Sequence, residues 1–132
     1  MTRSFGKDLS RKAPTGPDID FSGRWKNELG SEMMLNVKNG EVRGTYRTAV
    51  GEAPEEESFD LCGFAKGDLL VFCVNFGAYG SLAAWAGQHA IDNGKEEILA
   101  LWHLARNPRD GHEPKNLWST MLTGANTFTR TF

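Results

Sequence analysis

The chain has 132 residues, with 15 basic and 17 acidic side chains, and 39% of its residues are hydrophobic. This length fits one domain that can bury a core without metals or disulfides. The near balance of charge provides no broad basic surface for nucleic acid, and no apolar run reaches the roughly 20 residues that a membrane-spanning helix needs.

The N-terminal segment, residues 1–20, is polar and contains proline and glycine. It lacks the apolar stretch of a secretory leader, so we expect no signal peptide, and the compartment stays open. A flexible arm over residues 1–20 is expected to precede a single domain over residues 21–132.

Eight short strands of mostly alternating polarity are predicted after the arm. They fall at residues 23–28, 31–37, 42–48, 59–64, 70–76, 82–91, 97–105 and 118–130. Turn residues such as Asn39-Gly40 and Asn93-Gly94 mark hairpins between neighbouring strands. Sequential antiparallel strands fit a sandwich or a barrel. We expect an all-β, eight-stranded antiparallel up-and-down β-barrel, because closure removes exposed edges and leaves room for one small ligand.

Period-two alternation assigns one face of each strand to the interior. One end of this interior is apolar, and the other end mixes aromatic residues with six polar side chains: Asn27, Ser31, Tyr46, Thr48, Ser81 and Asn126. The alternation also turns Leu29 and Leu122 inward. A buried polar group without a partner costs roughly 1–3 kcal/mol, so these six need one another, water or a ligand. A small-molecule pocket is the functional interpretation, and a water-filled internal network is the alternative.

The two cysteines, Cys62 and Cys73, point outward on strands joined by a hairpin. A four-residue connection over residues 66–69 places them directly opposite each other. Opposed residues of an antiparallel pair can come close enough for a disulfide. Two free thiols at an interface are the other interpretation, and the spacing matches no metal-binding motif.

Five segments resemble the avidin/streptavidin family in their order and spacing. They read GRWKNELGS at 23–31, GTYRTAVG at 44–51, WAGQ at 85–88, LWHL at 101–104, and WST at 118–120 continuing to GANTFT at 124–129. The resemblance extends over residues 23–130. It implies a non-enzymatic protein that holds biotin as its ligand and uses no metal or cofactor; streptavidin is a known example of such a barrel.

The resemblance also implies a role for each site residue. Asn27, Ser31 and Tyr46 donate to the ureido oxygen of biotin, and Thr48 and Asn126 accept from its two N–H groups. The valerate carboxylate is implied to meet Ser81 and backbone amides of the loop around Gly51 and Ala53. The implied apolar lining consists of Leu29, Val50, Phe76, Trp85, Trp102 and Leu104.

Three features depart from the family pattern. Ala83 stands where many relatives have a threonine that hydrogen-bonds the ligand sulfur, and Phe76 replaces a tryptophan. The connection at residues 77–80 is shorter than its counterpart in streptavidin, which opens the carboxylate end of the site. Together these features imply tight biotin binding that falls short of the extreme.

Trp118 resembles the tryptophan with which family members cap the ligand of a neighbouring subunit. It implies a homo-oligomer. The outward residues Asp60, His103 and Thr123 are more polar than the patch by which tetrameric relatives pack, so a dimer or a loose tetramer is expected.

Two other functions remain open from the residues alone. One is a lipocalin-like barrel that carries a different small apolar ligand. The other is a structural or inhibitory β-module that uses its outer faces and has water inside. Calorimetry with biotin separates these two functions from biotin binding, because only a biotin-binding protein is expected to bind that ligand strongly.

Overall fold

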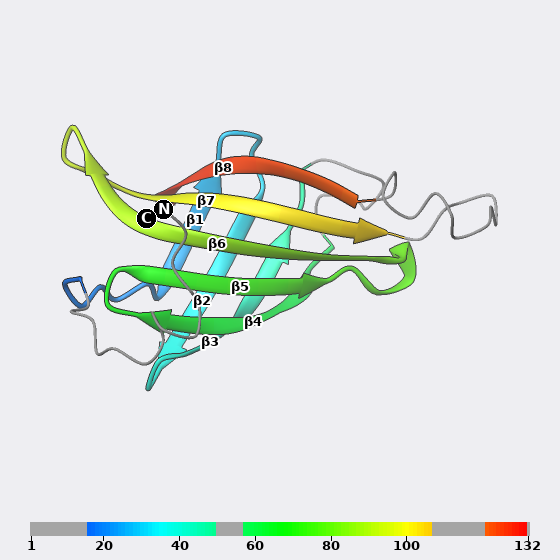
Figure 1. Ribbon diagram of the computed structural model, residues 1–132, viewed down its shortest axis with the longest axis horizontal. Coiled ribbons are helices and arrows are strands. Elements are labelled where there is room, and N and C mark those ends of the chain that lie inside the picture. The colour runs from blue at the N-terminus through cyan, green and yellow to red at the C-terminus, as the bar shows by residue number, and fades with distance from the viewer. Residues whose placement is uncertain (1–15, 50–56, 107–120, 132) are drawn as a thin grey trace, which may run out of the picture.

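The computed structural model describes residues 16–49, 57–106 and 121–131 and shows a closed β-barrel (Figure 1). The strands follow chain order, each antiparallel to the next, and β8 closes the barrel against β1. They are β1 (Gly23–Asn27), β2 (Glu32–Lys38), β3 (Glu41–Arg47), β4 (Phe59–Lys66), β5 (Leu69–Asn75), β6 (Ser81–Asp92), β7 (Lys95–Arg106) and β8 (Met121–Thr131). A short 3-10 helix, η1 (Gly77–Tyr79), connects β5 to β6. The described ranges contain no helix that is long and apolar enough to cross a membrane. The predicted up-and-down barrel is confirmed.

Two tight turns are built from the predicted Asn-Gly pairs. Asn39 and Gly40 have φ angles of 53° and 78°, and Asn93 and Gly94 have 50° and 77°. Positive φ at both central residues is the type I′ geometry, whose twist matches that of the flanking strands. The second turn joins β6 and β7, which run for 12 residues each. Both strands are longer than predicted, because their ladder continues to the turn itself.

The alternation of the sequence predicted most of the buried interior. Its apolar half consists of Trp25, Met33, Leu35, Val42, Leu70, Phe72, Val74, Ile98, Ala100 and Phe128, all of them buried. One inward prediction is wrong: Leu29 is 55% exposed because β1 ends at Asn27 and the period of two no longer applies in the turn. Leu122 lies on the inward face of β8, opposite Leu104, but it is 40% exposed where β8 has no pairing with β1.

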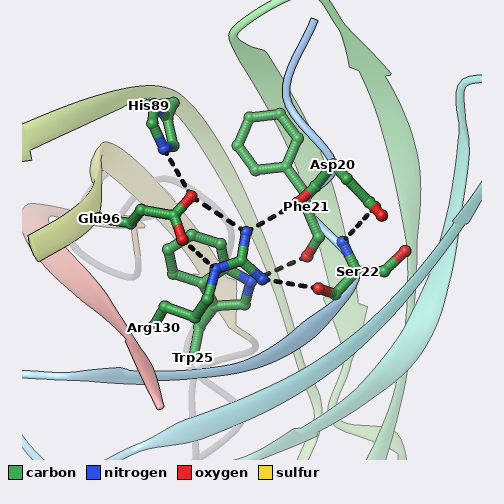
Figure 2. A network of polar contacts seen from close by, with 7 residues as sticks. All are labelled: Asp20, Phe21, Ser22, Trp25, His89, Glu96 and Arg130. Atoms are coloured by element: carbon green, nitrogen blue, oxygen red, sulfur yellow. Dashed lines mark hydrogen bonds and ion pairs between the residues drawn. The ribbon is translucent and has the colours of Figure 1, made fainter. Parts of the chain in front are cut away.

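A polar network closes the end of the barrel where β1 begins and β8 ends; we call this end the base. Figure 2 shows its members, which are Asp20, Phe21, Ser22, Trp25, His89, Glu96 and Arg130. The Arg130 guanidinium lies 4.3 Å from the centroid of the Trp25 ring and pairs with Glu96 through Nε and Oε2 at 2.6 Å. It also donates to the backbone carbonyls of Asp20 and Ser22, both at 2.7 Å. One side chain of β8 therefore ties the last strand to the segment that precedes the first.

The segment before β1 is docked on the base. Ile19 packs against the core, and its N–H donates to the carbonyl of Gly67 at 3.1 Å. The arm predicted over residues 1–20 therefore already contacts the barrel at Ile19. Residues 1–15, for which flexibility was also predicted, lie outside the described residues.

The base predicts a pH-dependent contribution to stability from Glu96. The hydrogen bond from Arg130 lowers the pKa of Glu96, and partial burial acts in the opposite direction. The hydrogen bond with His89 and the nearby positive charges lower the pKa of Glu96 further. A carboxyl group whose folded-state pKa is depressed stabilises the fold above its unfolded pKa of about 4.3, and this contribution is lost as the pH falls through the folded-state pKa. Urea unfolding of Glu96→Gln and wild type should therefore differ most above about pH 5 and converge in acid. A difference in unfolding free energy that does not change with pH would contradict this.

The cysteines lie on the outer surface in the predicted register. Cys62 is paired directly with Cys73 across β4 and β5, and both side chains are exposed. They are free thiols, with their Sγ atoms 3.9 Å apart. A disulfide bond is about 2 Å long, so this arrangement is one of two neighbouring thiols.

The pair also predicts unequal thiol reactivity. Burial raises the pKa of the Cys73 thiol, and the hydrogen bond and charge of Cys62 raise it further. Because the thiolate is the nucleophile, a raised pKa slows alkylation near neutral pH. Iodoacetamide at pH 8 should therefore modify Cys73 faster in Cys62→Ala than in the reduced wild type, as followed by peptide mass spectrometry. Equal rates in the two proteins would show that Cys62 does not control its neighbour.

Candidate functional site

The second end of the barrel gathers five buried polar residues, which we call the polar end: Asn27, Ser31, Tyr46, Thr48 and Asn126. They come from the end of β1, the turn before β2, the end of β3 with the residue after it, and the middle of β8. Because consecutive strands run antiparallel, these positions meet at one end of the barrel, opposite the base. All five were predicted as site residues.

Asn27 holds the turn between β1 and β2. Its Oδ1 accepts the N–H of Leu29 at 3.0 Å and that of Ser31 at 2.9 Å. An amide oxygen has two lone pairs, and both are engaged here, so the Nδ2 amino group is the part that can serve the interior. Asn27 therefore presents a donor.

Ser31 and Tyr46 add two more donors beside Asn27. The Oγ of Ser31 accepts the N–H of Ala49 at 2.9 Å, which leaves the hydroxyl proton of Ser31 to donate elsewhere. Burial raises the pKa of Tyr46, the hydrogen bonds with Ser31 and Asn27 oppose this, and the charge of Glu28 adds to the rise. The phenol therefore stays protonated at neutral pH and can donate. Asn27, Ser31 and Tyr46 are all buried, so the polar end holds three groups that are able to donate.

Asn126 has the opposite orientation. Its Oδ1 accepts the indole N–H of Trp85 at 3.0 Å, and its Nδ2 donates to Oε1 of Glu28 at 2.9 Å. The oxygen keeps a second lone pair that can accept from a ligand. The polar end therefore carries donors on one side and an acceptor on the other.

Aromatic rings surround the polar groups. The Tyr46 and Trp85 ring centroids are 5.0 Å apart, and Phe72 stacks on Trp85 at 4.8 Å with 12° between the planes. Phe76 contacts the edge of Tyr46 at 6.2 Å and Phe59 at 4.9 Å. Of these, Phe59 and Phe72 were not predicted as site residues. The signal was present, since Phe59 and Leu61 alternate on β4, but no inward face was assigned to that strand.

Trp102 lies across from Gly124, its register partner on β8. A Cβ atom added at Gly124 would come within 2.5 Å of the Trp102 ring, so the absence of a side chain there gives the indole its place. Trp102 and Leu104 are half-buried on β7. Both therefore stand at the transition from the packed interior to the polar end.

The remaining predicted site residues differ in whether they reach the interior. Thr48 is buried directly after β3, Ala83 is buried on β6, and Ser81 begins β6 half-buried. Leu29 does not join the interior and instead lines a surface groove with Lys26, Gly30, Glu32, Arg47, Thr48 and Ala49. Four further predicted residues lie outside the described ranges: Val50, Gly51, Ala53 and Trp118.

The arrangement suits recognition of a flat polar group by hydrogen bonds between aromatic walls. A group with one strong acceptor flanked by N–H donors complements the three donors and the acceptor of Asn126. Across residues 16–49, 57–106 and 121–131, no cluster of three or more His, Cys, Asp or Glu side chains is arranged to hold a metal ion.

Comparison with known proteins agrees with this anatomy. Residues 16–131 match the model of the avidin family. Avidin from Gallus gallus is 33% identical over 120 residues, which cover 83% of this chain and 77% of that protein. Among solved structures, a biotin-binding protein from chicken has a TM-score of 0.75 at 28% identity, covering 86% of this chain and 97% of that chain. Rhizavidin, solved as a complex with biotin, has a TM-score of 0.72 at 26% identity, covering 84% and 92%. The chain therefore belongs to the avidin family, whose members are binding proteins and not enzymes.

Proposed function

We propose that this protein binds biotin tightly and non-covalently at the polar end of the barrel. The observation that carries the proposal is the fixed and opposite orientation of two buried amides, Asn27 as donor and Asn126 as acceptor. A urea group has one carbonyl oxygen and two N–H groups. Its oxygen would receive hydrogen bonds from Asn27, Ser31 and Tyr46, and one N–H would donate to Asn126. Thr48, beside them, would accept from the second N–H.

The aromatic residues supply the rest of the proposed site. Trp85, Phe76 and Trp102 would enclose the bicyclic ring and the chain of biotin, since aromatic side chains bury large areas and keep their shape. Ser81 would contact the carboxylate together with Gly51 and Ala53, while Leu29, Val50 and Leu104 would complete the lining. In this function biotin is the bound ligand and no cofactor takes part.

The expected affinity for biotin is high but below that of the tightest non-covalent complexes, such as streptavidin with biotin. Ala83 is buried on β6 and offers no hydroxyl to the ligand sulfur. A typical net hydrogen bond is worth about 1 kcal/mol, so this absence costs less than about tenfold in affinity.

Calorimetry tests the proposal directly. Titration with biotin should show one site per chain, and saturating biotin should raise the melting temperature by about 10 °C, because a ligand at 100 times its Kd adds about 2.7 kcal/mol to the folded state. Fatty acids and retinoids serve as the comparison for a lipocalin-like carrier. No heat and no shift with biotin would reject the proposal, and a shift with lipids alone would favour the carrier.

We further propose that the chain forms a homo-oligomer in which Trp118 caps the site of a neighbouring copy. Exposed apolar side chains on the outer faces of β4 to β7 support association, and they include Phe64, Val71, Leu82, Leu99 and Leu101. Sedimentation measures the assembly, and Trp118→Ala should speed the release of biotin only in the assembled form. A monomer at micromolar concentration, or unchanged release in the variant, would contradict this proposal.

A further inference from the structure

Glu28 stands directly after β1, where the ladder with β8 stops. The last register pair of these strands is Asn27↔Phe128. Beyond this pair the Glu28 side chain bonds to β8 in place of a strand backbone. Its Oε2 accepts a hydrogen bond from the backbone N–H of Thr127 at 3.0 Å, and its Oε1 accepts one from Nδ2 of Asn126 at 2.9 Å. One carboxylate therefore holds both the backbone of β8 and the side chain of a site residue.

The chemistry of its two neighbours leaves the Asn126 amide a single orientation. An indole N–H can only donate, and a carboxylate can only accept. Trp85 on one side therefore requires the oxygen of Asn126, and Glu28 on the other side requires its amino group. Partial burial acts to raise the pKa of Glu28, but hydrogen bonds from Asn126 and from backbone amides hold it below its usual value, so the carboxylate is charged at neutral pH.

The charge of Glu28 also strengthens the acceptor. A hydrogen bond to an ionised group polarises the donor amide, and polarisation passes along a chain of hydrogen bonds. The oxygen of Asn126 therefore becomes a better acceptor for a ligand N–H. A ligand with an oxygen or another acceptor at this point would face the lone pair of the Asn126 oxygen. Neither acceptor would then have a hydrogen-bond donor.

We propose that Glu28 is a positioning residue that fixes Asn126 as an acceptor and thereby makes the site select a ligand with an N–H donor over an isostere with an oxygen at that point. This inference deepens the proposed biotin site and rests on it. Glu28 itself is exposed and touches the ligand site only through Asn126.

The test compares biotin with two cyclic carbamates in which one or the other ureido N–H is replaced by a ring oxygen. In Glu28→Leu, biotin should bind about 10-fold more weakly, while the carbamate whose oxygen faces Asn126 should lose little, so that the preference for biotin narrows about 10-fold. Glu28→Gln keeps an acceptor for Asn126 and should restore most of the preference.

Glu32 provides the matched control. It is also an acidic residue near this end, but it pairs with Arg47 and Lys26 and not with Asn126. Glu32→Gln removes the same charge and should leave the preference for biotin unchanged. If Glu28→Leu weakens biotin and the carbamate equally, Glu28 acts only on the fold and the inference is wrong.

A second measurement needs no ligand. The indole N–H resonance of Trp85 in the free protein reports the hydrogen bond to Asn126, so it should shift in Glu28→Leu and stay in place in Glu32→Gln. An unchanged resonance in Glu28→Leu would overturn the inference whatever the ligand. The two proposals can fail separately. If the resonance shifts in Glu28→Leu but the wild-type protein does not bind biotin, the proposed function is wrong and the positioning role of Glu28 is still supported.

Discussion

Replacing Tyr46 by phenylalanine is expected to weaken biotin binding about 10- to 100-fold, because it removes one of the three buried donors at the polar end. The ring that packs against Trp85 and Phe76 is kept. The effect should appear mainly as faster release, since the approach of the ligand does not depend on this hydroxyl. Displacement of labelled biotin, followed over time, measures it.

The chain provides its own control for this variant, since Tyr79 is the second of its two tyrosines. Its hydroxyl donates to Glu57 at 2.6 Å, and its ring lies 5.9 Å from that of Phe59, so Tyr79 stands at the same end of the barrel but is not one of the five buried polar residues. Tyr79→Phe should release biotin at the wild-type rate. Equal effects of the two substitutions would mean that Tyr46 has no special part in binding.

Arg130→Ala is expected to lower the free energy of unfolding by about 3 kcal/mol, which corresponds to a fall in melting temperature of about 10 °C. The substitution removes the cation–π contact with Trp25 and the partner of Glu96. It also leaves the carbonyls of Asp20 and Ser22 without these donors. Urea unfolding followed by tryptophan fluorescence measures the change.

Two further substitutions locate the cause. Arg130→Lys keeps the charge but loses the planar fork, so it should fall between alanine and wild type. Arg47→Ala breaks a surface ion pair with Glu32, and such pairs are worth about 0–1 kcal/mol. A loss in Arg130→Ala no larger than that in Arg47→Ala would contradict the role assigned to the base.

The sequence predicted the strands and most of the interior because both follow from local rules. Asn39-Gly40 and Asn93-Gly94 allow few conformations other than the observed turns, and the period of two holds wherever a ladder continues. It fails at Leu29, which lies beyond the end of β1. Strand ends depend on the partner strand, and a single segment carries no information about its partner.

Alternation predicted the polar residues of the site by type but not the orientation of their side chains. That Asn27 donates depends on the turn that uses its oxygen, and that Asn126 accepts depends on Glu28, 98 positions away in the chain. Arg130 lies 108 positions from Ser22 and 34 from Glu96, and no local pattern in the sequence connects these residues. The resemblance to a known family supplied roles that alternation alone left open.

A crystal structure of the protein with biotin tests the proposed site most directly. The ureido oxygen should lie within about 3.2 Å of Asn27 Nδ2, Ser31 Oγ and the Tyr46 hydroxyl, and a ureido nitrogen should lie at the same distance from Asn126 Oδ1. Biotin bound elsewhere on the barrel, or turned so that its ureido group does not face these four residues, would contradict it.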